Sequence, residues 1–470
     1  MWDLEKFSNN IAIIDEAGEK LSYKDLSKVS SLLGEAVGGR SLCFILCTNT
    51  IGSIIGYVSL VNNGIVPLLL SFHMERLLLD NLINLYKPQF IYLPSSARDE
   101  FPDFPEIYSG HGYSLIELGF SKEELFPLNE SLALLLTTSG STGSPKLVRQ
   151  SYKNIASNTE SIIEYLGIKE DERAITTLPM NYTYGLSIIN THLYAGATIL
   201  VTEKGLMQKE FWDFFEREGA TSFGGVPYTY EMLNKLKVTR MKLPSLRYMT
   251  QAGGKLSPTL HETFAKYAED LGKRFIVMYG QCEATARMGY LPPEKAMEKK
   301  GSMGIAIPGG KLWLRGEDGT EISEPLVAGE LIYEGPNVTM GYAESGEDLS
   351  LGDLRGGVLE TGDIAEFDQD GFFYIVGRKK RFLKIYGNRV NLDEVERHIR
   401  ERFGIEAASA GVDDHLKIFI TDGRDGEKIK TYISDITKLN PAAFEIRVIS
   451  EIPKNESGKV LYSVLEGENK

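Results

Sequence analysis

Short apolar runs alternate with segments of helical spacing along the N-terminal part of the chain. Continuous apolar runs of strand length at residues 41–48, 66–70 and 132–136 predict buried strands. The spacing of leucine and isoleucine predicts helices over residues 51–63 and 74–86, between those strands. A strand, a helix and a further strand in this order favour parallel sheets joined by crossover helices. The pattern therefore predicts an α/β fold.

The pattern changes in the C-terminal half. Short strands at residues 311–315, 329–333, 358–359 and 372–376 are separated by glycine and aspartate turns, which is typical of a small barrel. A helix is also predicted at residues 149–166, directly after a loop rich in glycine and serine.

The last part of the chain predicts a small α+β domain. Asn391 is positioned to cap a helix and Gly404 to end it. The apolar face of this helix carries Leu392, Val395, Ile399 and Phe403. Because the basic run at residues 377–381 precedes it, the sequence predicts an N-terminal domain over residues 1–378 and a C-terminal domain over residues 379–470.

Composition narrows the classes of function. The 470 residues include 51 Lys and Arg against 65 Asp and Glu, a net charge of −14 without a concentrated basic segment, so no nucleic-acid partner is expected. No apolar run approaches the roughly 18 residues of a membrane span. Three cysteines cannot form a disulfide framework, and no cysteine and histidine cluster has zinc spacing. We expect a reduced, soluble, cytoplasmic protein.

A loop with the sequence TTSGSTGSPKLV occupies residues 137–148 and has the chemistry of a phosphate site. Gly140 and Gly143 permit backbone angles that turn N–H groups toward one anion, and Lys146 adds a cation. Hydroxyl donors come from Thr137, Thr138, Ser139, Ser141, Thr142 and Ser144. The glycine spacing differs from that of the nucleotide-binding P-loop, which disfavours a conventional P-loop NTPase. A flexible linker shares this composition.

The nine residues from Thr138 to Lys146 resemble the signature of the adenylate-forming enzymes, which include acyl-CoA synthetases, peptide-synthetase adenylation domains and luciferases. The resemblance implies a large N-terminal domain of two parallel-rich sheets with helices and a small β-barrel, followed by a small α+β lid. It also implies that the loop binds the phosphates of ATP. Its residues are Thr138, Ser139, Gly140, Ser141, Thr142, Gly143 and Lys146.

A second string, Tyr279-Gly280-Gln281-Cys282-Glu283, resembles the family's Tyr-Gly-x-Thr-Glu, with Cys282 in place of threonine. It follows a predicted strand, where open α/β sheets place ligands. An aromatic face suits adenine, a glycine permits close backbone approach, and Glu283 is the expected Mg²⁺ ligand. We do not expect Cys282 to act as a nucleophile. Gly253 and Gly254 resemble a turn along one face of adenine, after which Lys255 is expected to point to solvent.

Further matches follow in the family's order. Asp363 is expected to accept ribose hydroxyls, and Arg378 resembles an arginine that contacts ribose or phosphate. Lys380 occupies the hinge position of the family, and Gly387 lies where the lid loop lines the path of the thiol. We assign residues 335–342, which match another family stretch, to structure because their glycines and proline fit turns.

Residues 453–459, with the sequence PKNESGK, resemble the family's C-terminal motif. The resemblance implies that Lys459 is catalytic and stabilises charge while the acid attacks the α-phosphate. The family usually continues Gly-Lys-x-x-Arg, and Tyr462 stands at that arginine position here.

The acyl pocket is predicted around Tyr182, Thr183 and Tyr228. Amino-acid-activating members place an aspartate where this chain has Thr183, so an amino acid is disfavoured. Tyr182, Tyr184 and Tyr228 would narrow the pocket toward a small or aromatic acid.

The expected reaction is ATP-dependent activation of a carboxylic acid to an acyl-adenylate with release of pyrophosphate, followed by transfer to a thiol. Coenzyme A is the expected acceptor, with Mg²⁺ as the cofactor. The alternative acceptor is the phosphopantetheine of an acyl carrier protein. An alternative of another class is a nucleotide-binding scaffold without turnover. The presence of Lys459, Glu283 and Asp363 argues against the scaffold.

Overall fold

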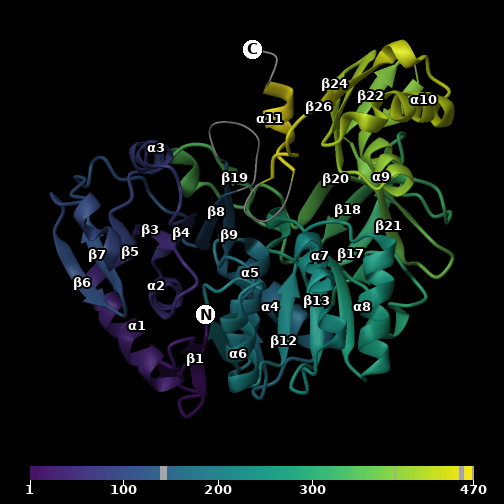
Figure 1. The fold of residues 1–470 in the computed structure, drawn as a ribbon. Helices are drawn as coiled ribbons and strands as arrows, with labels where there is room; N and C mark the ends of the chain where they lie inside the picture. Colours follow the sequence, from purple (N-terminus) through teal and green to yellow (C-terminus); the bar gives the residue numbers. More distant parts are fainter. Residues whose placement is uncertain (138–145, 380, 387, 455–459, 468–470) are drawn as a thin grey trace. The chain divides into compact units, whose positions relative to one another are not determined.

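The computed structural model describes residues 1–137, 146–379, 381–386, 388–454 and 460–467 (Figure 1). They divide into two compact units. The first unit takes residues 1–137, 146–311 and 333–359, and the second takes residues 312–332 and the described residues from 360 onward.

Two sheets build the first unit. In the described residues the larger sheet has the order β16-β15-β14-β13-β12-β10-β11-β1-β2. The six central strands of this sheet pair in parallel, and they are β14, β13, β12, β10, β11 and β1. Strands β2, β15 and β16 add antiparallel edges. The bounds are β16 Ile305–Ala306, β15 Gly289–Tyr290, β14 Arg274–Tyr279, β13 Tyr248–Gln251, β12 Ser222–Gly225, β10 Arg173–Ile175, β11 Thr198–Val201, β1 Ile11–Asp15 and β2 Lys20–Ser22.

The other sheet has the order β19-β9-β8-β4-β3-β5-β7-β6. Strands β8, β4, β3 and β5 are parallel, and the strands outside them are antiparallel. The bounds are β19 Tyr342–Ala343, β9 Leu147–Ser151, β8 Leu132–Thr137, β4 Val66–Ser71, β3 Leu42–Cys47, β5 Phe90–Pro94, β7 Tyr113–Glu117 and β6 Glu106–Gly110.

Helices link and cover these strands. Their bounds are α1 Tyr23–Val37, α2 Ile51–Asn62, α3 Arg76–Tyr86, α4 Tyr152–Leu166, α5 Thr183–Tyr194, α6 Lys209–Glu218, α7 Pro227–Lys235 and α8 Pro258–Asp270. One apolar cluster joins strands of both sheets to α1, α2 and α5, and α2 is buried along nearly its whole length. The α/β fold predicted from alternating strands and helices is confirmed.

The helix predicted over residues 149–166 is wrong at its start. Residues Leu147–Ser151 form β9, which pairs antiparallel with β8, and α4 begins only at Tyr152. All of β9 is buried, so sheet pairing decides the conformation there. Ser151 then caps α4 by accepting a hydrogen bond from the backbone N–H of Asn154 at 3.1 Å.

The second unit contains three small sheets and three α-helices in its described residues. Its first sheet has the order β17-β18-β20-β21, with β17 Lys311–Arg315, β18 Gly329–Glu334, β20 Val358–Phe367 and β21 Phe373–Arg378. A hairpin of β22 Phe382–Ile385 and β23 Asn388–Asn391 follows. The last sheet is β24 Ala407–Val412, β25 His415–Ile420 and β26 Phe444–Val448, accompanied by α9 Leu392–Phe403, α10 Gly426–Thr437 and α11 Tyr462–Gly467.

The predicted start and end of α9 are confirmed. The side chain of Asn391 accepts from the backbone N–H of Asp393, and Gly404 closes the helix with φ 68°. The division into compact units does not test where a moving lid begins, so the boundary between residues 378 and 379 stays a prediction. Within the described residues, no helix is long and apolar enough to cross a membrane.

Candidate nucleotide and acyl site

The strand β14 ends at Tyr279, and the chain then turns through Gly280. A Cβ atom at Gly280 would lie 1.6 Å from the carbonyl oxygen of Ala286, so no side chain fits there. The close approach expected of Gly280 is therefore an approach to the chain's own backbone. It brings the segment that carries Glu283 against the segment that follows it.

Glu283 and Lys146 meet around one tyrosine of the first unit. The hydroxyl of Tyr342 donates to Oε1 of Glu283 at 2.7 Å, and burial together with this carboxylate raises the pKa of Tyr342 to about 12. Nζ of Lys146 lies 5.8 Å from the Tyr342 ring centroid and 2.5 Å from Oε1 of Glu344. The guanidinium of Arg355 lies 4.9 Å from the same ring. Tyr342, which sequence reasoning assigned to a structural turn, thus contacts the expected metal ligand.

This donor set fits Mg²⁺. The described residues contain no group of three or more His, Cys, Asp and Glu side chains that could enclose a metal ion. Mg²⁺ commonly takes only one or two carboxylates and completes its shell with phosphate oxygens and water. Oε1 of Glu283 accepts the hydrogen bond from Tyr342. A single carboxylate beside Lys146 and Arg355 suits a magnesium–phosphate ligand.

Cys282 has the properties of a packing residue. Burial raises the pKa of its thiol, and the neighbouring charge of Glu283 raises it further. A thiol that stays protonated at neutral pH is a poor nucleophile. The hydroxyl of Thr183, at the start of α5, hydrogen-bonds this thiol. The structure therefore brings Thr183 of the predicted acyl pocket next to the Tyr279–Glu283 segment.

The predicted adenine turn lies against the predicted acyl pocket. Gly253 has φ +84°, and a Cβ there would lie 2.7 Å from the hydroxyl oxygen of Tyr182. At Gly254 a Cβ would meet Pro227 at 3.1 Å. Lys255 is exposed, as expected. Tyr228 is 50% exposed on α7, and it does not line the cavity described below.

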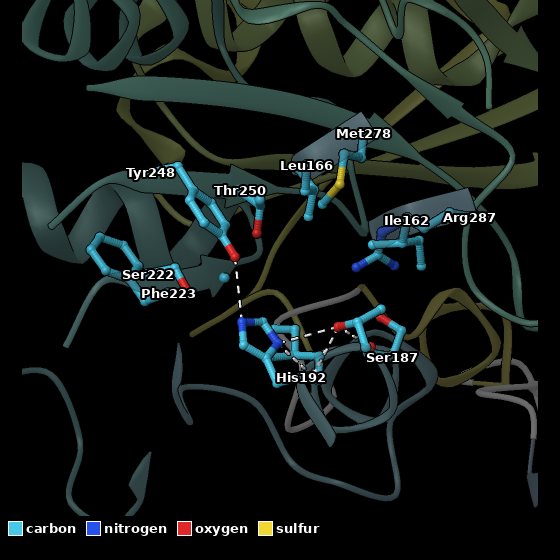
Figure 2. A pocket seen from close by; sticks show the side chains of 13 residues that line it. Ile162, Leu166, Ser187, His192, Ser222, Phe223, Tyr248, Thr250, Met278 and Arg287 are labelled. Carbon is cyan, nitrogen blue, oxygen red and sulfur yellow. Dashed lines mark hydrogen bonds between the residues drawn. The ribbon is translucent and has the colours of Figure 1, made fainter. Parts of the chain in front are cut away.

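A small cavity opens beside His192 and Thr250 in the first unit (Figure 2). Its free volume is about 20 Å³, and it is lined by residues of α4, α5, β12, β13 and β14. Nδ1 of His192 lies 2.8 Å from the carbonyl oxygen of Ile188, and burial lowers the pKa of this histidine. The hydroxyls of Tyr184 and Thr250 are 2.8 Å apart. Arg287, which sequence reasoning missed, also lines this cavity and lies only four residues after Glu283.

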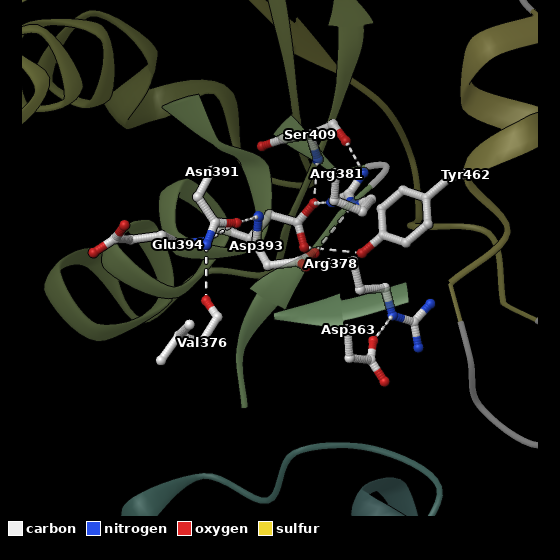
Figure 3. Close-up of polar contacts among 10 residues, drawn as sticks. Asp363, Val376, Arg378, Arg381, Asn391, Asp393, Glu394, Ser409 and Tyr462 are labelled. Carbon is white, nitrogen blue, oxygen red and sulfur yellow. Dashed lines mark hydrogen bonds and ion pairs between the residues drawn. The ribbon is translucent and has the colours of Figure 1, made fainter. Parts of the chain in front are cut away.

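In the second unit, Asp363 and Arg378 are partners across β20 and β21 (Figure 3). Their register places them opposite each other, with Nε of Arg378 3.3 Å from Oδ1 of Asp363. Asp363 is buried, whereas the side chain of Arg378 is half-exposed. The structure thus brings together the two residues predicted to contact ribose and phosphate.

Tyr462 belongs to a buried polar cluster of the second unit (Figure 3). Its hydroxyl donates to Oε2 of Glu396 at 2.9 Å, and the guanidinium of Arg381 lies 3.7 Å from its ring centroid. Arg381 also bonds the carboxylates of Glu396 and Asp393 and, at 2.6 Å, the carbonyl oxygen of Ser409. Burial raises the pKa of Glu396, and the charge of Arg381 opposes that shift. Tyr462 therefore ties the C-terminal segment to the residues that follow position 380.

The family model described as AMP-binding enzyme matches residues 2–343. The chain belongs to this AMP-binding family. An oxalate–CoA ligase of Arabidopsis thaliana is 29% identical over 359 residues, which cover 72% of this chain and 68% of that protein. A 2-succinylbenzoate–CoA ligase of Bacillus pumilus is also 29% identical, over 350 residues that cover 72% and 69%.

Solved structures show the same fold along the whole chain. The o-succinylbenzoate CoA synthetase of Bacillus subtilis, in complex with its acyl-adenylate intermediate, matches with a TM-score of 0.80 and 22% identity. The match covers 99% of this chain and 98% of that one. The predicted architecture of an AMP-binding enzyme is therefore confirmed for both the large N-terminal part and the small C-terminal part.

Several residues of the family signatures lie outside the described residues. They are Thr138, Ser139, Gly140, Ser141, Thr142, Gly143, Lys380, Gly387 and Lys459. The residues that flank Lys459 are described: Lys454 and Val460 form a β-bridge, and the backbone N–H of Leu461 donates to the carbonyl oxygen of Pro453 at 2.8 Å. The roles assigned to the nine residues stay predictions.

Proposed function

We propose that this AMP-binding protein is an AMP-forming acid–thiol ligase that uses coenzyme A. The observation that carries the proposal is the grouping of Glu283, Tyr342 and Lys146 at the carboxyl end of β14. Ligands of open α/β sheets bind at such strand ends. One carboxylate and a nearby lysine suit a magnesium-bound triphosphate, and the relatives named as CoA ligases support the reaction class.

In the first half-reaction, a carboxylate oxygen of the acid attacks the α-phosphorus of ATP. A bond forms between this oxygen and the α-phosphorus. The bond between the α-phosphorus and the oxygen that bridges the α- and β-phosphates breaks, and pyrophosphate leaves. Glu283 would hold Mg²⁺, which neutralises phosphate charge. Lys146 would bind phosphate oxygens, and Lys459 would stabilise the charge that develops during the attack. Asp363 would accept the ribose hydroxyls, and Arg378 would contact ribose or phosphate.

In the second half-reaction, the thiol sulfur of coenzyme A forms a bond to the acyl carbon and its proton passes to solvent. The bond between the acyl carbon and the phosphate oxygen breaks, and AMP leaves. We propose that residues 379–470 act as a lid that rotates about Lys380 between the two half-reactions, with Gly387 along the path of the thiol. Tyr182 and Thr183 would border the acyl group. The contact between Thr183 and the Cys282 thiol supports this placement.

The test is pyrophosphate release with MgATP over a panel of carboxylic acids, with and without coenzyme A. Acid-dependent release that coenzyme A accelerates, with acyl-CoA as the product, is the expected result. Acid-dependent release that coenzyme A does not affect would assign the acceptor to a carrier protein instead. A protein that binds ATP and releases no pyrophosphate with any acid would be the scaffold alternative, and the proposal would be wrong.

A further inference from the structure

Among the described residues, no carboxylate pairs with the buried charge of Arg287, whose guanidinium hydrogen-bonds the hydroxyl of Tyr165. Arg287 is 3% exposed, its Nε has no hydrogen-bond partner, and no ion pair joins it to an acidic side chain of the described residues. Its guanidinium lies 4.0 Å from the ring centroid of Tyr184. An unpaired charge in the interior is costly, and proteins usually keep one only where a counter-charge arrives.

The cavity in front of Arg287 places one positive charge among neutral, largely apolar side chains. No residue lining it is acidic, and its polar lining consists of hydroxyl groups and His192. Because burial lowers the pKa of His192, this ring is neutral and Arg287 is the one charged group of the lining. Figure 2 shows the guanidinium nitrogens of Arg287 directed toward the middle of the cavity.

The backbone holds Arg287 firmly in this position. Its carbonyl oxygen accepts from Nδ2 of Asn158 and from Nδ2 of Asn337, each at 2.9 Å. The two residues before it, Thr285 and Ala286, have φ of 58° and 120°, conformations that side-chain-bearing residues rarely adopt. Strained backbone of this kind persists where the surrounding structure fixes it, and it gathers at ligand sites. Arg287 is thus prepositioned for a ligand.

The cavity adjoins the residues expected around the acyl group. The rings of Tyr182 and Tyr184 lie 6.4 Å apart, and Tyr184 is the residue on which Arg287 stacks. Tyr182 in turn lies against Gly253 of the predicted adenine turn. A ligand whose one end reaches the nucleotide at Gly253 would therefore place its other end toward Arg287.

We infer, on the basis of the proposed ligase function, that the acid is a dicarboxylic acid. One carboxylate is activated by ATP, and the other forms an ion pair with the guanidinium of Arg287. The free volume of about 20 Å³ holds roughly one water-sized group, which is less than a carboxylate, so lining side chains must shift to admit the distal group. A short acid requires the smallest shift. A fatty acid would instead bury its methylene groups against an uncompensated charge.

Matched pairs of acids test this inference. Each dicarboxylic acid of two to eight carbons is compared with the monocarboxylic acid of equal length, by kcat/KM for pyrophosphate release. The wild-type protein should prefer the dicarboxylic member. Arg287→Met should lower kcat/KM for that acid by about a hundredfold or more, since an interior anion then lacks its partner. It should leave the monocarboxylic acid equal or better, and Arg287→Lys should retain part of the preference.

Arg274→Met is the matched control. Arg274 also stacks on a tyrosine of the cavity, 5.0 Å from the ring centroid of Tyr248, but it donates to the carbonyl oxygen of Leu166 and does not line the cavity. The Arg274→Met variant should show the same preference between dicarboxylic and monocarboxylic acids as the wild type. A wild-type preference for monocarboxylic acids would overturn the inference and leave the ligase function intact, even if Arg287→Met failed to fold.

Binding without turnover separates the two proposals. A dicarboxylate alone should raise the Tm of the wild type and of Arg274→Met but not of Arg287→Met. This result together with no pyrophosphate release for any acid would disprove the ligase function and retain the carboxylate site. Equal Tm shifts in wild type and Arg287→Met would overturn the site.

Discussion

Replacing Tyr462 with arginine restores the residue that the family usually has, yet we expect it to destabilise this protein. A guanidinium group is already present at this position, because that of Arg381 lies 3.7 Å from the Tyr462 ring centroid. In Tyr462→Arg a second guanidinium would enter the same buried cluster. The substitution would also remove the tyrosine hydroxyl that donates to Oε2 of Glu396 at 2.9 Å.

The size of the effect follows from the geometry. Two unit charges about 5 Å apart repel by about 3 kcal/mol at an effective dielectric constant of about 20. The lost contact between Arg381 and the aromatic ring adds about 1 kcal/mol. Glu396 and Asp393 attract the new charge and offset part of this, which leaves a loss of about 2 kcal/mol in unfolding free energy. At about 4 °C per kcal/mol, the value between small and larger domains, the Tm should fall by about 8 °C.

The double variant Arg381→Met with Tyr462→Arg isolates the cause. With Arg381 gone, the new arginine can pair with Glu396 alone, so the double variant should be more stable than Tyr462→Arg. The assay is thermal unfolding of the wild type, both single variants and the double variant, analysed as a double-mutant cycle. Wild-type stability in Tyr462→Arg, or no recovery in the double variant, would show that Arg381 does not determine the residue at position 462.

Three further predictions concern other parts of the chain. Gly280→Ala should lower both the Tm and pyrophosphate release, because the new Cβ would lie 1.6 Å from a carbonyl oxygen, whereas Gly39→Ala, in open space, should resemble the wild type in both assays. Burial lowers the pKa of His192 from its ordinary value of 6.5. When the pH falls below 6.5, His192 therefore binds a proton in the unfolded chain and stays neutral in the folded chain. Stability should therefore fall with falling pH by up to about 1.4 kcal/mol per pH unit, and urea unfolding of His192→Gln should lack this part of the slope. Lys459→Ala should lose adenylation and keep ATP binding, measured by pyrophosphate release and titration calorimetry. Lys454→Ala, which removes only an ion pair with a glutamate, should keep both.

Local signals explain how much of the fold the sequence could predict. The helix α9 was predicted from Asn391 to Gly404 because its cap, its apolar face and its end are all encoded within a dozen or so residues. The strand β9 was missed because its conformation depends on partners that lie elsewhere in the sequence. Arg149, in its middle, is fully buried and donates to the carbonyl oxygens of Met340, Tyr342, Leu351 and Gly352. The pattern of apolar and polar residues in 147–151 gives no sign that Arg149 will bond those carbonyl oxygens.

The same distinction applies to the site. Glu283 and Gly280 were predicted because they share one short string, although the atom that requires glycine at 280 belongs to Ala286. Tyr342 was read as part of a turn, since the contact with Glu283 joins residues 59 positions apart. A motif supplies the residue types of a site, but distant side chains that complete it become visible only in the folded chain.

Arg287 is a candidate functional residue that only the folded structure identifies. In the sequence it is one arginine among 51 basic residues, and nothing local separates it from a solvated charge. In the fold it is buried beside neutral lining residues, and its backbone is fixed by two asparagines from distant segments. The family signatures concern the nucleotide, whereas the relatives described above are named for different acids, oxalate and 2-succinylbenzoate. Under the proposed function, acid specificity depends on residues outside the signatures. A buried arginine near the predicted acyl pocket, without an acidic partner among the described residues, is the kind of residue that can determine it.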